Sequence, residues 1–190
     1  MRTIPQWLAE RCVIYVGTNR VVVEIISLGL VFKFPIIRLI ALYRSVLGFV
    51  RGTAFVPFSR WFSYPMESEG FLGFRRLVFK GVMDNWREYW FCLVERHSFA
   101  QPTYFSFFGL VNIQLRGEPL VMDQWEFRGQ LQKFIEERVL YSDAHHFTSI
   151  NNFCISDGKL RILDYGSRKT QNIIRERGMC VYQNFQVRVN

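Results

Sequence analysis

The segment Tyr141–Ser167, YSDAHHFTSINNFCISDGKLRILDYGS, decides the predicted fold. Within it, the apolar run Phe153–Ile155 and the alternating run Leu160–Leu163 flank the turn sequence Ser156–Lys159. Two strand-like runs joined by a short turn that contains Asp-Gly are typical of a β-hairpin. We therefore predict a hairpin whose two outer ends lie side by side.

Polar side chains stand at both outer ends of this hairpin. Asn151 and Asn152 enter the first strand, and Asp164 follows the second. An amide oxygen and a carboxylate held close together are ligands that Mg²⁺ accepts alongside the phosphates of a nucleotide. Since phosphoryl transfer depends mainly on such a charge clamp and on positioning, we expect a metal site at these residues. The alternative is a plain hairpin with capping Asn and Asp side chains.

The run NNFCISDGKLRILDYGS, residues 151–167, resembles a segment of the protein-kinase-like superfamily. That segment extends from the catalytic-loop Asn to the Asp-Phe-Gly motif, whose place Asp164-Tyr165-Gly166 takes here. The resemblance implies an α+β fold with a small antiparallel N-lobe sheet plus helix, a hinge and a reduced C-lobe. It also implies ATP and Mg²⁺ as cofactors, with Asn151 or Asn152 and Asp164 as the metal ligands.

The catalytic carboxylate can be placed in two registers. If Asn152 is the metal Asn and nothing is inserted, Phe147 stands where the family has its catalytic Asp, which describes a pseudokinase. If Asp143-Ala144-His145 instead matches the Asp-x-His of the small-molecule and sugar branches, Asp143 is the catalytic residue. The loop from Asp143 to Asn151 is then a few residues longer than usual. We favour Asp143, and both registers remain open at this point.

The N-terminal part of the chain predicts three antiparallel strands within residues 12–34. Lys33 lies in the third strand, where the resemblance implies that it binds the α- and β-phosphates of the nucleotide. Two observations weigh against that role. Gly17 stands alone where protein kinases have a glycine-rich loop, and a Lys in an edge strand is also a common solubility device.

A helix is predicted at about residues 74–96, with Leu77, Val78, Trp86, Trp90 and Leu93 on roughly one face. Glu88 lies in the middle of this helix, where a carboxylate among aromatic residues is costly unless it is paired. The resemblance implies that a Glu of this helix orients the Lys of the preceding strand, and Glu88 is the candidate. Asp84 and Glu95 are the alternatives for this role.

The segments on either side of this helix complete the predicted organisation. Residues 36–50 predict another helix with two Arg on an otherwise apolar surface, which we expect to be buried in the core rather than at a membrane interface. Residues 104–115 predict two strands hinged near Gly109. Residues 1–115 would thus form the N-lobe-like region. Residues 116–190 would form the reduced C-lobe, with a helix from Asp123 to about Tyr141 and the catalytic-loop-like segment 141–167.

Charge is distributed unevenly along the 190 residues. Residues 1–60 contain 8 basic and 2 acidic side chains, while residues 61–190 contain 16 and 14, and the net charge is +8. Such an excess favours an anionic partner. Partners of this kind include a nucleotide, an anionic or protein acceptor, a phospholipid surface and, less readily, a nucleic acid.

The four cysteines are far apart and lack C-x-x-C spacing, so neither a zinc site nor a disulfide framework is indicated. A reducing compartment is the simpler interpretation. The N-terminus lacks the pattern of a secretory signal, and charged residues and a Pro interrupt the most apolar stretch. We expect a cytoplasmic protein, with peripheral membrane contact as an additional expectation.

Three functions follow from these patterns. The first is an ATP- and Mg²⁺-dependent phosphotransferase that acts on a hydroxyl of a protein or a saccharide-containing acceptor. The second is a catalytically dead pseudokinase that serves as a partner-binding module. The third is a basic nucleic-acid-binding protein, although the sequence contains no RNP-like or zinc-knuckle pattern.

Overall fold

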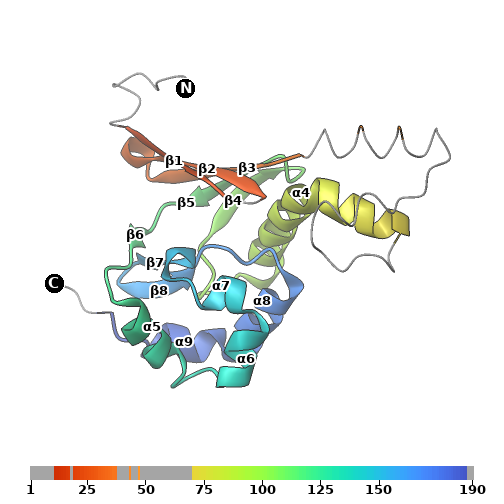
Figure 1. Ribbon diagram of the computed structural model, residues 1–190. Coiled ribbons are helices and arrows are strands. Elements are labelled where there is room, and N and C mark those ends of the chain that lie inside the picture. Colours follow the sequence, from red (N-terminus) through yellow and green to blue (C-terminus); the bar gives the residue numbers. More distant parts are fainter. Residues whose placement is uncertain (1–10, 18, 38–42, 44–46, 48–69, 188–190) are drawn as a thin grey trace.

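The computed structural model describes residues 11–17, 19–37, 43, 47 and 70–187, and in Figure 1 a five-stranded sheet forms the upper layer of the molecule. Most of the predicted helix at residues 36–50 and most of the connection that follows it lie outside the described residues. Within the described part, no helix is long and apolar enough to cross a membrane.

The first sheet is antiparallel, with strand order β1-β2-β3-β5-β4. Its strands are β1 (Cys12–Val16), β2 (Arg20–Ile25), β3 (Leu30–Pro35), β4 (Thr103–Phe107) and β5 (Val111–Leu115). The strands predicted within residues 12–34 and 104–115 are therefore present. A 3₁₀ turn, η1 (Ile26–Leu28), joins β2 to β3, and Gly29 ends it with a φ of 63°, a conformation that glycine adopts without strain.

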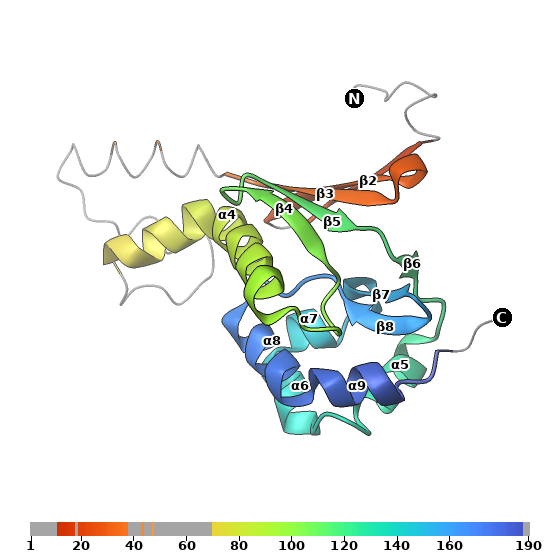
Figure 2. The ribbon, with the colours of Figure 1, turned by 180° about the vertical axis from the view of Figure 1, so that it is seen from behind.

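Helix α4 (Gly70–Glu95) crosses the lower face of this sheet, as Figure 2 shows. The backbone is not helical at Phe79, where the helix kinks. The β1–β2 turn and the end of β3 meet α4 closely at Gly81, because a Cβ there would lie 2.3 Å from the carbonyl oxygen of Asn19 and 2.9 Å from Cβ of Pro35. Only a glycine at this position lets the helix approach the sheet so closely.

The prediction of which face of α4 is buried is wrong in part. Trp90 and Leu93 are exposed, whereas Asn85, Glu88 and Phe91 are buried. The physical reason lies in the sheet, whose lower face presents polar side chains to α4, so that the helix turns its own polar side chains toward them. The buried polar residues of this sheet face are Arg20, Lys33, Thr103, Asn112 and Gln114.

The C-terminal part contains a second antiparallel sheet, in the order β6-β7-β8. It is formed by β6 (Glu118–Pro119), β7 (Phe153–Ser156) and β8 (Lys159–Ile162). Strands β7 and β8 form the predicted hairpin, with Phe153 opposite Ile162. Its turn has positive φ at both Asp157 and Gly158, as a two-residue hairpin turn that matches the strand twist requires.

Helices lie below and beside this second sheet (Figure 1). They are α5 (Gln124–Leu131), α6 (Glu137–Ser142), α7 (Ala144–Phe147), α8 (Arg168–Ile173) and α9 (Met179–Asn184), with the short turn η2 (Ile150–Asn152) and the π-helical turn η3 (Ile174–Gly178). The single helix predicted from Asp123 to about Tyr141 is wrong, since the chain breaks between α5 and α6. Ile135 and Leu140 are both buried, and residues five apart face different sides of a helix with about 3.6 residues per turn.

The apolar core lies in this C-terminal part and is rich in phenylalanine. Phe153 is surrounded by rings, with centroid distances of 4.8 Å to Phe127, 6.1 Å to Phe147 and 6.2 Å to Phe99. The first sheet, in contrast, contributes Val31 as its buried hydrophobic residue. A polar layer therefore joins the first sheet to the rest of the molecule, and the predicted site residues Lys33 and Glu88 belong to that layer.

We predict that Tyr165→Phe lowers the free energy of unfolding by about 1–3 kcal/mol. The Tyr165 hydroxyl is fully buried, donates a hydrogen bond of 2.7 Å to the carbonyl oxygen of Gln101 and lies 2.9 Å from Oγ1 of Thr103. The substitution leaves both partners buried with one contact fewer. Urea denaturation measures the effect, and Tyr141→Phe, at a position that is 51% exposed, is the matched control. Equal stability of the two variants would contradict this account.

Candidate active site

Lys33 and Glu88 form a buried ion pair between β3 and α4. Glu88 Oε2 lies 2.9 Å from Lys33 Nζ, which also donates a hydrogen bond of 2.6 Å to the carbonyl oxygen of Leu163. Strand β3 is the middle strand of the sheet, so Lys33 is not an edge residue placed for solubility. Burial lowers the pKa of Lys33, although the Glu88 carboxylate acts in the opposite direction.

The other two acidic residues of α4 have different partners. Asp84 Oδ1 lies 3.8 Å from Arg87, and Glu95 Oε1 lies 2.9 Å from Arg175. Of the three carboxylates weighed for the pairing with Lys33, Glu88 is therefore the one that the structure brings to it. Asn85, three residues before Glu88 on α4, also joins the helix to the first sheet, because its Nδ2 donates hydrogen bonds to the carbonyl oxygens of Lys33 and Gly109.

Arg20 is a site residue that the sequence analysis missed. From the start of β2 its Nη1 reaches Glu88 Oε1 at 2.6 Å, and its Nη2 contacts Asp164 Oδ1. Burial by itself would lower the pKa of Arg20, but the carboxylates of Asp164 and Glu88 outweigh burial and raise that pKa. Nothing in the local sequence points to this role, because an Arg that follows Gly17 and Asn19 is an ordinary turn residue.

Asn152 and Asp164 both lie at the outer end of the hairpin. The Leu163 backbone N–H donates a hydrogen bond of 2.7 Å to the carbonyl oxygen of Asn152, which pairs Asn152 with the residue that precedes Asp164. Asn152 Nδ2 donates to the carbonyl oxygens of His145 and His146 at 3.0 and 3.1 Å. The amide oxygen of Asn152 is thus the atom that remains for a ligand, whereas Asn151 is exposed.

The charge of Asp164 is held by three cations. Burial alone would raise the pKa of this carboxyl, but Arg20, Lys33 and His146 outweigh burial and hold the pKa well below its usual range. The named contacts of Asp164 are made through Oδ1. Its side chain is 28% exposed, so the ionised carboxylate is accessible to a ligand.

His146 connects Asp164 to Asp143. Its Nδ1 lies 2.8 Å from Asp143 Oδ1, and its Nε2 lies 3.7 Å from Asp164 Oδ1. The second oxygen of Asp143 accepts a hydrogen bond of 2.5 Å from Thr170 Oγ1 of α8. His146 and Thr170 were missed as site residues, and the only signal for His146 was its place three residues after Asp143.

The titration of Asp143 and His146 is coupled through this contact. Burial favours the neutral acid of Asp143, but the hydrogen bonds from His146 and Thr170 outweigh it and lower the pKa of Asp143. Burial also disfavours the charged form of His146, yet the hydrogen bond to Asp143 and the nearby Asp164 carboxylate raise the pKa of His146. The pair is therefore stabilised as carboxylate and imidazolium.

Phe147, the residue of the alternative register, points away from these groups. Its side chain is fully buried in the core against Phe153. Asp143, four residues earlier, instead faces His146 and the site. A phenylalanine at position 147 is thus explained by packing.

Gly166 ends the motif because it packs against the backbone of α4. A Cβ at this position would lie 2.6 Å from the carbonyl oxygen of Asp84 and 2.8 Å from its Cα. A larger side chain would push α4 away from the segment that follows β8 and would separate Glu88 from Arg20 and Lys33.

The donor set at the hairpin end fits a shared rather than a self-sufficient metal site. Within the described part of the chain, no group of three or more His, Cys, Asp or Glu side chains could hold an ion. Mg²⁺ is commonly bound through one or two carboxylate or amide oxygens, with phosphates and water completing its shell. The Asp164 carboxylate and the Asn152 amide oxygen are donors of this kind.

No protein-family model, curated protein or solved structure matches this chain.

The four cysteines are free thiols, and burial raises the pKa of Cys154 to about 12, which makes that thiol a poor nucleophile. The network around Glu88 is consequently the site on which a functional proposal can be based.

We predict that Glu88→Gln lowers the free energy of unfolding by about 3–5 kcal/mol, because it leaves Lys33 and Arg20 buried beside a neutral amide. Urea denaturation provides the measurement. Glu95→Gln on the same helix is the matched control, since Glu95 pairs with Arg175 at a side chain that is 33% exposed, where an ion pair contributes at most about 1 kcal/mol. Similar losses in both variants would show that the buried pairing is not special.

We predict a second, pH-dependent effect from His146. Its pKa is raised in the folded protein, so its stabilising contribution is complete below the unfolded pKa of about 6.5 and is lost as pH rises through the higher folded pKa. The free energy of unfolding, measured in urea without added Mg²⁺, should therefore fall above about pH 6.5. His146→Gln should flatten this slope. Parallel profiles for the wild type and the variant would exclude His146 as the cause.

Proposed function

We propose that the protein is a phosphotransferase that binds ATP with Mg²⁺ at this site and transfers the γ-phosphate to a hydroxyl. The observation that carries the proposal is one connected set of charges, Lys33–Glu88–Arg20–Asp164–His146–Asp143, with the contacts given above. These residues come from β2, β3, α4, the segment after β8 and the segment around α7, and they are distant in sequence. They meet at the polar boundary between the first sheet and the C-terminal part.

The arrangement supports a distinct role for each predicted residue. Lys33 would bind the phosphates of the nucleotide, and Glu88 would orient it, as the resemblance to the protein-kinase-like superfamily implies. Asp164 and Asn152 would hold Mg²⁺, which supplies positive charge that neutralises the phosphate oxygens. The α+β architecture, with its helix between the third and fourth strands and its hairpin after Asp143, supports a kinase-like fold as part of the proposal.

Asp143 would accept the hydroxyl proton of the acceptor. Its lowered pKa makes it a weak base, which suits phosphoryl transfer because positioning and charge stabilisation supply most of the catalysis. His146 and Thr170 would fix the orientation of the carboxylate through its two oxygens. The acceptor in this proposal is a hydroxyl of a protein or of a saccharide-containing molecule.

Arg20 supports a second candidate function, a nucleotide-free binding module. Its guanidinium contacts both Asp164 and Glu88 and so neutralises the carboxylate that Mg²⁺ would require. In an active enzyme Arg20 must share Asp164 with the metal or move onto the phosphates. In a pseudokinase Arg20 would retain both contacts permanently, and the cluster would be structural.

The two candidates differ in their response to nucleotide. We predict that ATP with Mg²⁺ raises the melting temperature of the wild type, since a ligand that binds only the folded state adds about 2.7 kcal/mol at a hundredfold excess over Kd. Asp164→Asn should abolish the Mg²⁺-dependent part of the shift. Asp157→Asn, in the exposed hairpin turn, is the matched control and should behave like the wild type.

Asp143→Asn separates binding from chemistry in the same experiment. It should keep the Mg²⁺-dependent melting shift and lower the release of ADP, with water as the acceptor, by about a hundredfold or more. A wild type that melts cooperatively but shows no shift with millimolar ATP and Mg²⁺ would overturn the phosphotransferase proposal and favour the binding module.

A further inference from the structure

The upper face of the first sheet, opposite α4, is apolar across all five strands. Residues that pair across neighbouring strands share a face, and one such row runs Ile14, Val23, Phe32, Ile113 and Phe105 from one edge to the other. The rows beside it add Cys12, Val16, Val21, Ile25, Leu30, Phe34, Phe107, Val111 and Leu115. We call these fourteen residues the outer face.

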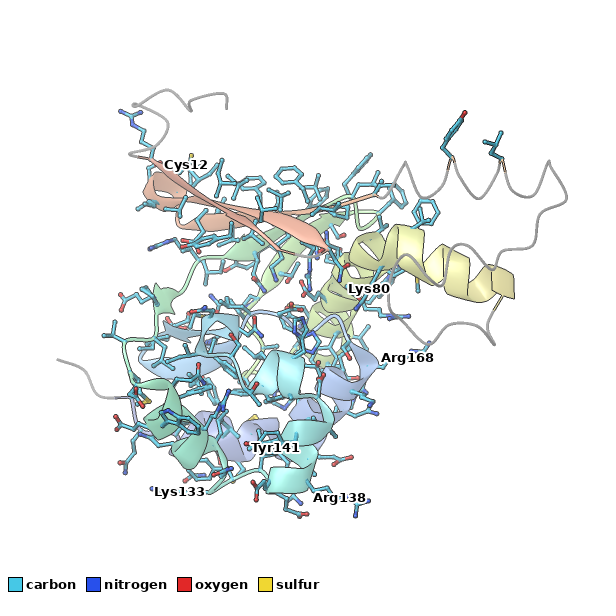
Figure 3. All side chains as sticks on the ribbon, viewed as in Figure 1. Cys12, Lys80, Lys133, Arg138, Tyr141 and Arg168 are labelled. Atoms are coloured by element: carbon cyan, nitrogen blue, oxygen red, sulfur yellow. The ribbon has the colours of Figure 1, made fainter. Side chains whose placement is uncertain are left out.

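The outer face is open in the described part of the molecule. None of its residues is buried, and Val16, Phe105 and Phe107 are 75%, 49% and 53% exposed. Figure 3 shows the side chains of the sheet standing on its upper side, while α4 and the C-terminal part lie below. A contiguous apolar surface of this kind on a folded protein marks an interaction site.

The charge of the chain favours an anionic partner. No outer-face residue is charged, whereas the chain has a net charge of +8, and residues 1–60 contain 8 basic and 2 acidic side chains. An apolar surface on a cationic protein matches the acyl chains and headgroups of an anionic bilayer. A second copy of the chain is a poorer match, because two copies of the same cationic chain repel each other.

We propose that the outer face docks the protein on an anionic lipid bilayer. Strand β3 separates this surface from the candidate active site, since Phe32 and Phe34 belong to the outer face while Lys33 points to Glu88. A bound protein would therefore keep the phosphate site turned away from the lipid. The proposal does not depend on the proposed phosphotransferase activity, because it uses the opposite face of the sheet.

Co-sedimentation with lipid vesicles tests the proposal on the full chain. The wild type should bind vesicles that contain phosphatidylglycerol, bind pure phosphatidylcholine at least tenfold more weakly, and lose affinity for the anionic vesicles as salt rises. The double variant Ile14→Glu with Phe105→Glu places a charge on each edge of the outer face. Its partition onto anionic vesicles should fall about tenfold or more. Val121→Glu, at an apolar position that is 78% exposed and lies between β6 and α5, is the matched control and should bind like the wild type.

Three results would overturn the proposal. The first is equal binding of the wild type to both kinds of vesicle, or binding to neither, which needs no variant. The second is a wild-type dimer in sedimentation equilibrium that the double variant dissociates, because the outer face would then bind a second copy. The third is a large loss of melting temperature in the double variant without vesicles, which would show that residues of the chain itself cover the face. A double variant that keeps the ATP-dependent melting shift separates failure of docking from failure of the active-site proposal.

Discussion

Glu88 is the residue on which the arrangement of the first sheet, α4 and the hairpin depends. Its carboxylate is fully buried and contacts Lys33 through one oxygen and Arg20 through the other. Burying three charges is costly unless they neutralise one another, and Asp164 balances the second cation. The four charges sum to zero only when β2, β3, α4 and the segment after β8 are all in place. The cluster therefore couples elements from both ends of the chain.

This coupling explains why the first sheet is polar on the side that faces the molecule. Asn112 Nδ2 donates to the carbonyl oxygen of Asn85, and Asn85 in turn holds backbone oxygens of β3 and of the β4–β5 turn. Hydrogen bonds of this kind are strong only where water is excluded. The apolar residues of the same strands are left on the outer face, and the apolar core forms instead around Phe153 in the C-terminal part. One sheet thus has a charged inner face and an apolar outer face.

The cations of the charge cluster could exchange their ionic partners on ligand binding. Arg20 and Lys33 are held by carboxylates in this structure, and the phosphates of a nucleotide would offer them anionic partners of higher charge. The Asp164 carboxylate released in that exchange could then take a divalent cation. His146 lies within reach of both acidic side chains, so its protonation couples the charge at Asp164 to that at Asp143.

The strands and the hairpin were predictable because they rest on local rules. Alternating apolar residues indicate strands, an Asp-Gly turn closes a hairpin of fixed register, and that register brings the segment that contains Asn152 next to the segment that contains Asp164. The predicted continuous helix up to Tyr141 failed because the core needed both Ile135 and Leu140, a demand set by distant residues. The predicted face of α4 failed for a related reason, since it assumed that apolar side chains point inward.

The local elements and a short list of polar candidates, which included Lys33, Glu88, Asp143 and Asp164, thus follow from sequence patterns. Arg20, His146 and Thr170 join them only in the folded chain, because their contacts connect different elements of the structure. It also decided which face of the sheet is buried. Alternation distinguishes two faces of a strand but not the one that will be covered, and here the need to neutralise buried charge prevailed over the tendency to bury apolar surface.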